Sequence, residues 1–158
     1  HTMTIRAAQT ADAQQIAGIW NDAIRETTVT FNPIEKTSEE VAALIAKDSF
    51  VWEENGQVLG FARYFAFRGG EGYRFTSEHT VMVHPDQQGR GGGRELMQTV
   101  LSHAKAAGKR SMIAGCSAEN PDAVRFHAKL GFQEVATLRE VGFKFGRWID
   151  LVLMQRTL

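Results

Sequence analysis

The sequence predicts one domain of mixed α/β structure, and three observations support this prediction. The chain has 158 residues, a length that suits a single hydrophobic core. Segments with a helical spacing of apolar residues alternate with β-branched and aromatic segments, in the order β-α-α-β-β-β-α-β-α-β-β. The chain contains no internal repeat, linker or low-complexity tail. We therefore expect one α/β domain with a mixed sheet (α+β) over residues 3–158, and we interpret residues 1–2 as a tag remnant.

The N-terminal segments indicate a strand, a helix and a loop. Residues 4–8 have the pattern of a short strand. Thr10 is expected to cap a helix over residues 11–25, because apolar side chains then recur at helical spacing. These side chains are Ile16, Ile19, Trp20, Ala23 and Ile24. Residues 27–33 are rich in β-branched side chains and end in a proline, which favours an extended loop.

The middle of the chain predicts a second helix, a hairpin and a further strand. Thr37 and Glu40 have the spacing of a capping box, which marks the start of a helix. Residues 49–67 contain two strand patterns around Asn55-Gly56, a dipeptide favoured in two-residue hairpin turns. Residues 73–83 have the pattern of another long strand.

The C-terminal half predicts two helices and three strands. A helix is expected over residues 91–107, ended by a glycine, and a strand over residues 111–117. Asn120 has the position of an N-cap for a helix that begins at Pro121. The last two strands are expected over residues 132–139 and 148–155.

Composition argues against several classes of function. Lys plus Arg and Asp plus Glu number 18 each, so the chain lacks the basic excess typical of proteins that bind nucleic acid or anionic membranes. It shows no signal-peptide pattern and no apolar run long enough to cross a bilayer. Cys116 is the one cysteine, which favours a reducing cytoplasm and suits a small core residue better than a nucleophile. His and Cys show no metal-ligand spacing, so we expect no metal.

A glycine-rich segment over residues 84–96 (HPDQQGRGGGREL) gives the first functional hypothesis. It follows a strand pattern and opens an expected helix. The free N–H groups and partial positive charge of a helix N-terminus attract phosphate, and glycines let the backbone approach closely. The residues of this possible anion cradle are Gln88, Gly89, Arg90, Gly91, Gly92, Gly93 and Arg94.

The glycines alone leave several interpretations open. A P-loop would end in Gly-Lys-Ser/Thr, whereas this segment ends in Gly93-Arg94-Glu95. A dinucleotide-binding fingerprint needs G-x-G-x-x-G, and neither Gly89 nor Gly91 starts that spacing. An RGG tail would recur, but this RGG occurs once. A plain strand-to-helix turn remains the alternative to phosphate binding.

Two separate motifs resemble those of the GCN5-related N-acetyltransferase (GNAT) superfamily. Residues 81–93 (VMVHPDQQGRGGG) carry V-x-V-x-P and then Q-x-x-G-x-G, which is similar to its acetyl-CoA signature. Residues 119–132 (ENPDAVRFHAKLGF) are similar to its downstream N-x-x-A segment. The resemblance implies the GNAT fold, acetyl-CoA as cosubstrate and direct transfer within a ternary complex. Besides the glycine segment, it implies cofactor contacts by Val81, Met82, Val83 and Asn120, the last of which also fits a simple helix cap.

Three further segments resemble phosphinothricin N-acetyltransferases and the relatives that acetylate methionine sulfoximine or methionine sulfone. They are residues 19–31, 67–85 and 142–155. The resemblance implies a small amino acid-like amine as acceptor, of the phosphinothricin, methionine sulfoximine or methionine sulfone type, and often a homodimer. The alternatives are acetylation of another amine, such as a protein N-terminus, and a non-catalytic acetyl-CoA-binding module.

Glu78 is the candidate general base, acting directly or through a water molecule. Side chains alternate along a strand, so Glu78, Thr80 and Met82 are expected to share one face. Glu78 matches the glutamate of the T-V-E segment in the resembled family, on the strand that leads to the glycine segment. A base that works near neutral pH needs a pKa raised by partial burial. A solvated glutamate paired with Arg63 or Arg74 is the alternative.

The resemblance also suggests groups for the remaining steps. In the resembled family, this strand diverges from the neighbouring strand near Met82 and Val83. A backbone N–H of one of these two residues is therefore expected to stabilise the oxyanion that forms when the amine attacks the thioester. His127 lies where many members of the superfamily have a tyrosine that is thought to protonate the leaving thiolate. A partly buried packing histidine is the equal alternative for His127.

Four residues are candidates for binding the acceptor. Arg68 and Lys144 match the pattern of the branch and could hold a carboxylate. Tyr73 and Phe31 could form walls of the pocket. Solvation at the surface is the alternative for the two cations, and core packing is the alternative for the two aromatic rings.

Gly92 matches no position that the motif requires. A glycine in the first turn of a helix costs up to about 1 kcal/mol relative to alanine. We therefore expect Gly92→Ala to keep activity, and we expect Gly91 and Gly93 to tolerate substitution poorly.

Overall fold

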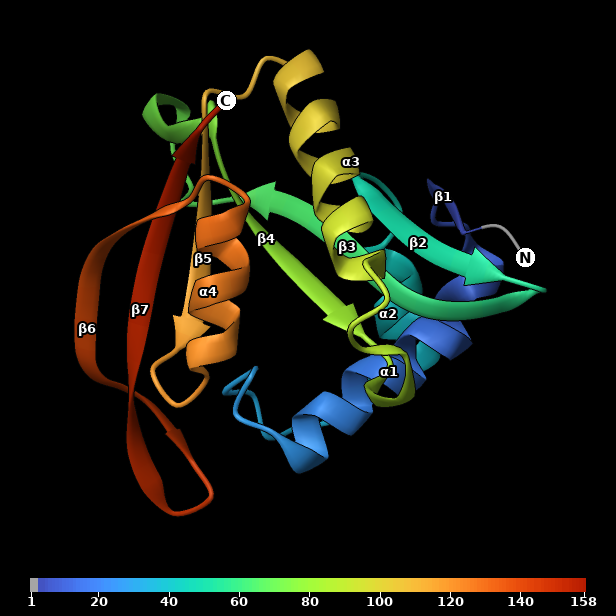
Figure 1. Cartoon of the computed structure of the whole chain (residues 1–158), viewed down its shortest axis with the longest axis horizontal. Coiled ribbons are helices and arrows are strands. Elements are labelled where there is room, and N and C mark those ends of the chain that lie inside the picture. The colour runs from blue at the N-terminus through green and yellow to red at the C-terminus, as the bar shows by residue number, and fades with distance from the viewer. Residues whose placement is uncertain (1–2) are drawn as a thin grey trace.

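The computed structural model describes residues 3–158, so the predicted tag remnant at residues 1–2 lies outside the described residues. Within the described part, a seven-stranded sheet has the strand order β1-β2-β3-β4-β5-β7-β6 (Figure 1). The strands are β1 (Thr4–Ala7), β2 (Ser49–Glu54), β3 (Gln57–Ala66), β4 (Thr76–Val83), β5 (Ser111–Ser117), β6 (Gln133–Lys144) and β7 (Arg147–Thr157). The α-helices are α1 (Ala13–Glu26), α2 (Ser38–Leu44), α3 (Gly92–Ala106) and α4 (Pro121–Lys129). The predicted mixed α/β class is confirmed.

Helices cover both faces of the sheet and divide the core into two parts. Trp52 of β2 packs in one cluster with Leu96 and Met97 of α3. Its neighbour Val51 packs in the other cluster with Ile16 of α1. Because side chains alternate along a strand, α3 lies on one face of the sheet and α1 on the other.

Two local predictions from sequence are confirmed by backbone geometry. Glu40 N–H donates to Thr37 Oγ1, and Thr37 N–H donates to the Glu40 carboxylate, both at 3.1 Å, so the capping box of α2 is complete. Asn55 and Gly56 have φ values of 53° and 79° in the turn between β2 and β3. Positive φ at both positions is the mark of a type I′ hairpin turn.

The predicted N-cap at Thr10 is wrong. Thr10–Asp12 form a turn of 3-10 helix, and α1 begins only at Ala13. The Asp12 carboxylate accepts the Gln9 N–H at 2.8 Å and the Arg6 guanidinium at 2.8 and 2.9 Å. Asp12 is therefore the N-cap position of α1, although its carboxylate is bonded to Gln9 and Arg6 and accepts no hydrogen bond from the helix itself.

The boundaries of β4, β6 and β7 differ from the predicted ones. Glu71–Tyr73 form a short 3-10 turn, so β4 begins at Thr76 rather than at residue 73. β6 and β7 continue to a tight turn, where Lys144 pairs with Arg147. The rings of Phe143 and Trp148, 4.7 Å apart between centroids, extend this hairpin beyond the residues that the strand pattern marked.

β4 and β5 run parallel and pair over only three residues, ending at Glu78 on β4. Beyond that point, β4 remains paired with β3 as far as Val83, and β5 remains paired with β7 as far as Ser117. The two strands therefore diverge after Glu78, as Figure 1 shows. The divergence leaves one edge of β4 without a strand partner.

Candidate active site

The hydrogen-bond pattern between β3 and β4 determines which backbone groups of β4 face the divergence. Phe67 N–H donates to Thr76 O at 3.3 Å, and His84 N–H donates to Leu59 O at 2.8 Å. In an antiparallel pair, every second residue bonds to the partner strand. The register between these two bonds is regular, so the even-numbered residues of β4 bond to β3. The odd-numbered residues direct their backbone groups to the β5 side.

Val81 and Val83 therefore present their N–H and C=O groups where β5 has turned away. Gln88 occupies part of this edge, because its Nε2 donates to Val83 O at 3.1 Å. The N–H of Met82 faces β3 instead, and the Met82 side chain is buried in the cluster of α1. Of the two predicted oxyanion donors, the geometry favours Val83 over Met82.

The glycine segment ends in a helix N-terminus that has no side-chain cap. Gly89 and Gly91 have φ values of 80° and 86°, in the left-handed region that other residues rarely adopt. Gly91 is the N-cap of the 15-residue helix α3, and no side chain accepts a hydrogen bond from the first turn. Arg94 is exposed on that turn, and no side chain among residues 3–158 pairs with it. Free N–H groups, the helix dipole and a cation together fit an anion.

Arg90 has a structural partner that the motif did not reveal. Its guanidinium donates to both carboxylate oxygens of Glu54, at 2.9 and 3.0 Å, and to Gln87 Oε1 at 2.7 Å. It also lies over the Trp52 ring, with Cζ 5.2 Å from the centroid. The hydrogen bonds from Arg90 hold the pKa of the Glu54 carboxyl below its ordinary value. Arg90, which was predicted to bind the cofactor, is therefore bonded to Glu54. Arg94 is the arginine that remains available to an anion at the start of α3.

The packing around Gly92 argues against the expected tolerance of alanine there, and the space around Gly93 argues against the expected intolerance at that position. A Cβ atom on Gly92 would lie 2.0 Å from Cε3 of Trp52, which is fully buried. The ring is fixed in place by the hydrogen bond from Trp52 Nε1 to Glu54 at 3.2 Å. At Gly93, a Cβ atom would meet its nearest neighbours only at an ordinary 3.5 Å. Packing therefore requires glycine at position 92 and not at position 93.

Glu78 lies where β4 and β5 diverge, and its side chain is partly buried. Its Oε2 is 3.8 Å from the place that a Cβ atom on Gly115 would take, and a Leu151 methyl is 3.4 Å from the same place. Arg74 pairs with Glu71 instead, and the Arg63 guanidinium lies over the Phe65 ring. Burial raises the pKa of the Glu78 carboxyl. These surroundings fit a general base and not a solvated ion pair.

Gly115 is a candidate site residue that was not predicted from the sequence. It is exposed in the middle of β5, although its neighbours Ala114 and Cys116 are buried. The missing side chain leaves space beside the Glu78 carboxylate. One signal was available, because a glycine inside a strand pattern often marks the close approach of a ligand or another backbone.

His127 is buried in a pair of imidazole rings. Its Nδ1 lies 2.8 Å from Ala123 O, and its Nε2 lies 3.1 Å from Nε2 of His79. A carbonyl oxygen only accepts, so we assign the proton of neutral His127 to Nδ1, and Nε2 then accepts from His79. Burial lowers the pKa of both rings, that of His79 to about 3. Of the two interpretations of His127, this geometry favours the packing histidine.

Asn120 combines its predicted capping role with a place beside a cavity. Its Oδ1 accepts the Ala123 N–H at 3.2 Å and so caps α4. A cavity of about 380 Å³ lies next to it. The residues that line this cavity are Glu26, Thr27, Thr28, Val29, Glu119, Asn120, Phe145 and Arg147.

The four predicted acceptor residues fall into two separate groups. Arg68 and Tyr73 lie in the β3–β4 connection, with the Arg68 guanidinium 5.3 Å from the centroid of the Tyr73 ring, and both are exposed. Phe31 belongs to the loop after α1, and Lys144 lies at the end of β6. Figure 1 shows the β3–β4 connection near the C-terminus of the chain and the loop after α1 near the β6–β7 turn. One pocket in a single chain does not hold all four.

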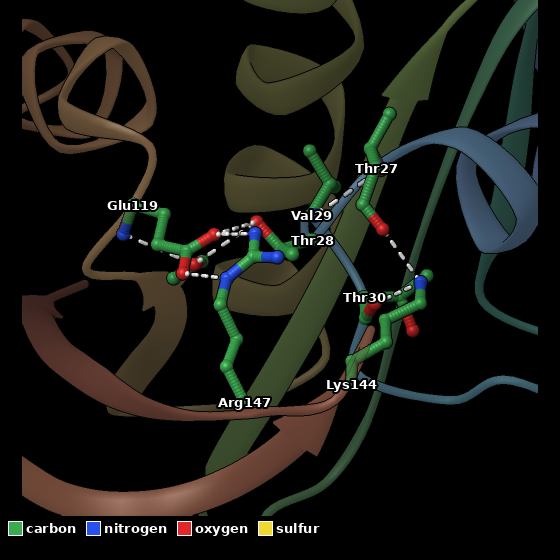
Figure 2. A network of polar contacts seen from close by, with 8 residues as sticks. Thr27, Thr28, Val29, Thr30, Glu119, Lys144 and Arg147 are labelled. Carbon is green, nitrogen blue, oxygen red and sulfur yellow. Dashed lines mark hydrogen bonds and ion pairs between the residues drawn. The ribbon is translucent and has the colours of Figure 1, made fainter.

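Lys144 binds main-chain carbonyls, as Figure 2 shows. Its Nζ donates to Thr27 O at 2.6 Å and to Thr30 O at 2.7 Å. The residue is only 3% exposed, and burial lowers the pKa of its ammonium group. Two of its three N–H donors are therefore engaged, and these contacts do not support the predicted carboxylate-binding role.

Three further observations concern a metal site, a membrane-spanning helix and a cysteine nucleophile. Residues 3–158 contain no group of three or more His, Cys, Asp or Glu side chains placed to hold a metal ion. In the same part of the chain, no helix is long and apolar enough to span a membrane. Burial raises the pKa of the Cys116 thiol to about 11, so this thiol is protonated at neutral pH and fits a core residue.

Comparisons with known proteins agree with this geometry. The model of the acetyltransferase (GNAT) family matches residues 17–132. The chain is 40% identical to the L-methionine sulfoximine/L-methionine sulfone acetyltransferase of Salmonella typhimurium, over 99% of this chain and 95% of that protein. It is 36% identical to the phosphinothricin N-acetyltransferase of Alcaligenes faecalis, over 98% of this chain and 82% of that protein.

A solved structure gives the same result at the level of the fold. The structure of an acetyltransferase from Salmonella typhimurium with its cofactor acetyl-CoA has a TM-score of 0.96 to this chain at 38% identity. The match covers 100% of this chain and 95% of that one. The chain belongs to the acetyltransferase (GNAT) family, as its two separate motifs predicted.

Proposed function

We propose that this protein transfers an acetyl group from acetyl-CoA to the free amine of a small amino acid-like acceptor. One observation carries the proposal: β4 diverges from β5 at Glu78, a partly buried carboxylate. The same strand leads to the uncapped N-terminus of α3. A base and an anion site thus lie at the two ends of one unpaired strand edge. Membership of the GNAT family supports the same activity.

The unpaired edge of β4 has the groups needed to hold acetyl-CoA. The N–H groups at the start of α3 and the Arg94 guanidinium suit the pyrophosphate. The pantetheine arm contains amides, which can pair with the free backbone N–H and C=O of Val81. Asn120 borders the cavity beside this region. When bound, acetyl-CoA supplies a thioester whose carbonyl carbon an amine can attack.

In the proposed mechanism, Glu78 takes the proton that the acceptor amine must lose. Its raised pKa makes it a stronger base than an exposed glutamate. The N–H of Val83 donates to the oxygen that becomes negative in the transition state. Gly115 leaves room for the amine next to the carboxylate. We assign no proton donor for the leaving thiolate, because both ring nitrogens of His127 already form hydrogen bonds, one with Ala123 O and one with His79.

The acceptors that we propose are phosphinothricin, methionine sulfoximine and methionine sulfone. Two relatives with 36% and 40% identity over nearly the whole chain carry the names of these substrates. All three molecules are amino acids with a free α-amine, the group that the proposed chemistry requires.

We also propose that the protein is a cytoplasmic homodimer. β6 is an edge strand of the sheet, and the β6–β7 hairpin exposes several large apolar side chains. They are Val135, Leu138, Val141, Phe143, Phe145 and Trp148, each between 39% and 64% exposed. Apolar side chains on an exposed strand edge favour association with another chain. The free Cys116 is compatible with a reducing compartment.

A CoA-release assay over a panel of amines tests the proposal. The panel contains phosphinothricin, methionine sulfoximine, methionine sulfone, the common amino acids and a peptide with a free N-terminus. We expect kcat/KM for at least one of the first three to exceed that for the other amines by about 100-fold. Weak and equal release with every amine would contradict the proposed acceptor class, and fast turnover of the peptide alone would favour protein acetylation.

A further inference from the structure

The loop over residues 27–31 is attached to the C-terminal hairpin at three points. At the first, Lys144 Nζ donates to Thr27 O and Thr30 O (Figure 2). No acidic side chain among residues 3–158 forms an ion pair with this ammonium group, and the Phe145 ring lies 5.0 Å away. A buried cation is costly unless it is hydrogen-bonded, so the two carbonyls account for its position.

The second attachment runs through Glu119, at the start of the turn before α4. Its carboxylate accepts two hydrogen bonds from Arg147, both at 2.7 Å, and one from Thr28 Oγ1 at 3.2 Å (Figure 2). The Thr28 hydroxyl also accepts from Ser117 Oγ at 3.4 Å. These groups are more exposed than Lys144, so we expect this attachment to be the weaker of the two.

The third attachment is a close contact between an aromatic ring and a glycine. A Cβ atom on Gly142 would lie 2.4 Å from Cδ2 of Phe31, so the ring rests directly on the β6 backbone. Gly142 and Lys144 are both buried, on the same side of β6. The end of the hairpin therefore has one face shaped to receive the loop.

The position of the loop connects it to the proposed reaction. Thr27, Thr28 and Val29 line the cavity of about 380 Å³ that also contacts Asn120. Thr28 lies against Ser117, which is two residues, or about 7 Å, along β5 from Gly115. Gly115 in turn borders the Glu78 carboxylate. The loop therefore borders a cavity at the end of β5, the strand whose Gly115 lies beside the candidate base.

We propose that Lys144 is a positioning residue: by binding the carbonyls of Thr27 and Thr30, it holds the loop that shapes the approach of the amine acceptor to Glu78. This inference rests on the proposed function and deepens it, because it assigns acceptor selection to a contact outside the reacting groups. It predicts a larger effect on the acceptor than on acetyl-CoA, since most of the proposed acetyl-CoA groups lie on β4 and α3, and of those groups Asn120 lines the same cavity as this loop.

Two variants and one matched control test the proposal. Lys144→Met keeps the aliphatic stem and removes the donors, and Glu119→Gln weakens the second attachment at an exposed position. Lys105→Met removes a lysine that is exposed on α3 and serves as the control. For Lys144→Met, we expect amide hydrogen exchange of residues 27–31 to accelerate about 10-fold or more. The KM of the amine should rise several-fold and the KM of acetyl-CoA should change less, with smaller effects in the same direction for Glu119→Gln.

The two readouts separate the possible failures. Unchanged amide hydrogen exchange of residues 27–31 in both variants would overturn the proposal that Lys144 holds this loop, whatever the enzyme acetylates. Faster exchange with an equal rise in both KM values would overturn the role in acceptor selection. If the wild-type protein acetylates none of the amines, the proposed function fails, and the exchange measurement still decides whether Lys144 holds the loop.

Discussion

Among residues 3–158, Glu78 is set apart from the other shifted carboxylates by its surroundings. Asp12, Glu54 and Glu119 each accept hydrogen bonds from an arginine, and these bonds hold the pKa of each carboxyl below its ordinary value. Hydrogen bonds from Thr37 lower the pKa of Glu40 in the same way. Glu78 has no such cation, and burial raises its pKa. A paired carboxylate is a poor base, whereas a partly buried, unpaired one is suited to proton transfer near neutral pH.

A second effect at the residue scale is the contact of Gly92 with Trp52. In Gly92→Ala, the methyl group would overlap a buried ring, and overpacking of this kind costs about 1–3 kcal/mol. This cost exceeds the gain of up to about 1 kcal/mol that alanine brings to a helix. We expect a lower Tm for Gly92→Ala in the protein without ligand, measured by calorimetry.

Gly93→Ala is the matched control for that measurement. Its φ is not in the left-handed region, and its new methyl group would meet neighbours at 3.5 Å. We expect an unchanged or slightly higher Tm for this variant. A Gly92→Ala protein as stable as Gly93→Ala would show that the Trp52 ring can move aside at little cost.

At the scale of the element, the start of α3 contains two arginines with different roles. Arg94 is free at the first turn, and Arg90 is bonded to Glu54. We expect Arg94→Gln to raise the KM of acetyl-CoA about 3- to 10-fold, most strongly at low salt, with little change in Tm. Arg90→Gln should mainly lower Tm, because it removes the hydrogen bonds to a buried carboxylate.

Steady-state kinetics and thermal unfolding of the two variants check this assignment. The same rise in the KM of acetyl-CoA for both variants, with no loss of stability in Arg90→Gln, would show that Arg90 can leave Glu54 for the cofactor. A KM that Arg94→Gln leaves unchanged would exclude Arg94 from the anion site.

Features with local causes could be predicted from the sequence, and features that depend on distant partners could not. The capping box at Thr37 and the Asn55-Gly56 turn follow from residues a few positions apart, and both are confirmed. The predicted cap at Thr10 is wrong because Thr10–Asp12 form a 3-10 turn, in which Asp12 is bonded to Arg6 of β1. Pattern alone could not show that Gly92 faces Trp52, forty positions away in the sequence.

The candidate site shows the same division. The motifs indicated Glu78, the glycine segment and Asn120, and these residues lie along the unpaired edge of β4 or beside the cavity. Arg68 and Lys144 were predicted to share one role, but they lie in different parts of the fold. The role of Gly115 depends on the register between β4 and β5, which no local pattern specifies.

At the scale of the whole molecule, the exposed hairpin predicts self-association. A charge at its most exposed ring should prevent the burial of this surface, so we expect Trp148→Glu, at a residue that is 64% exposed, to be monomeric. The wild-type chain of 17.6 kDa should sediment at about twice that mass at micromolar concentration. A wild-type monomer would contradict the homodimer, and a dimeric Trp148→Glu would place the interface elsewhere.

The central claim for the whole enzyme is that Glu78 accepts the proton of the amine where β4 and β5 diverge. Only the ionised carboxylate is a base, so activity should be complete above its pKa and fall as pH decreases through it. Because burial raises that pKa, the loss should occur at a higher pH than for an ordinary glutamate near 4.5. Repeating the pH profile with an acceptor whose amine has a different pKa distinguishes the ionisation of Glu78 from that of the acceptor amine.

The most direct test is the pH profile of kcat/KM for the best acceptor, in the wild type and in Glu78→Gln. We expect Glu78→Gln to reduce kcat by about 100- to 10,000-fold, to abolish the acid limb of the profile and to leave acetyl-CoA binding unchanged. A Glu78→Gln enzyme with the turnover and pH profile of the wild type would contradict the mechanism.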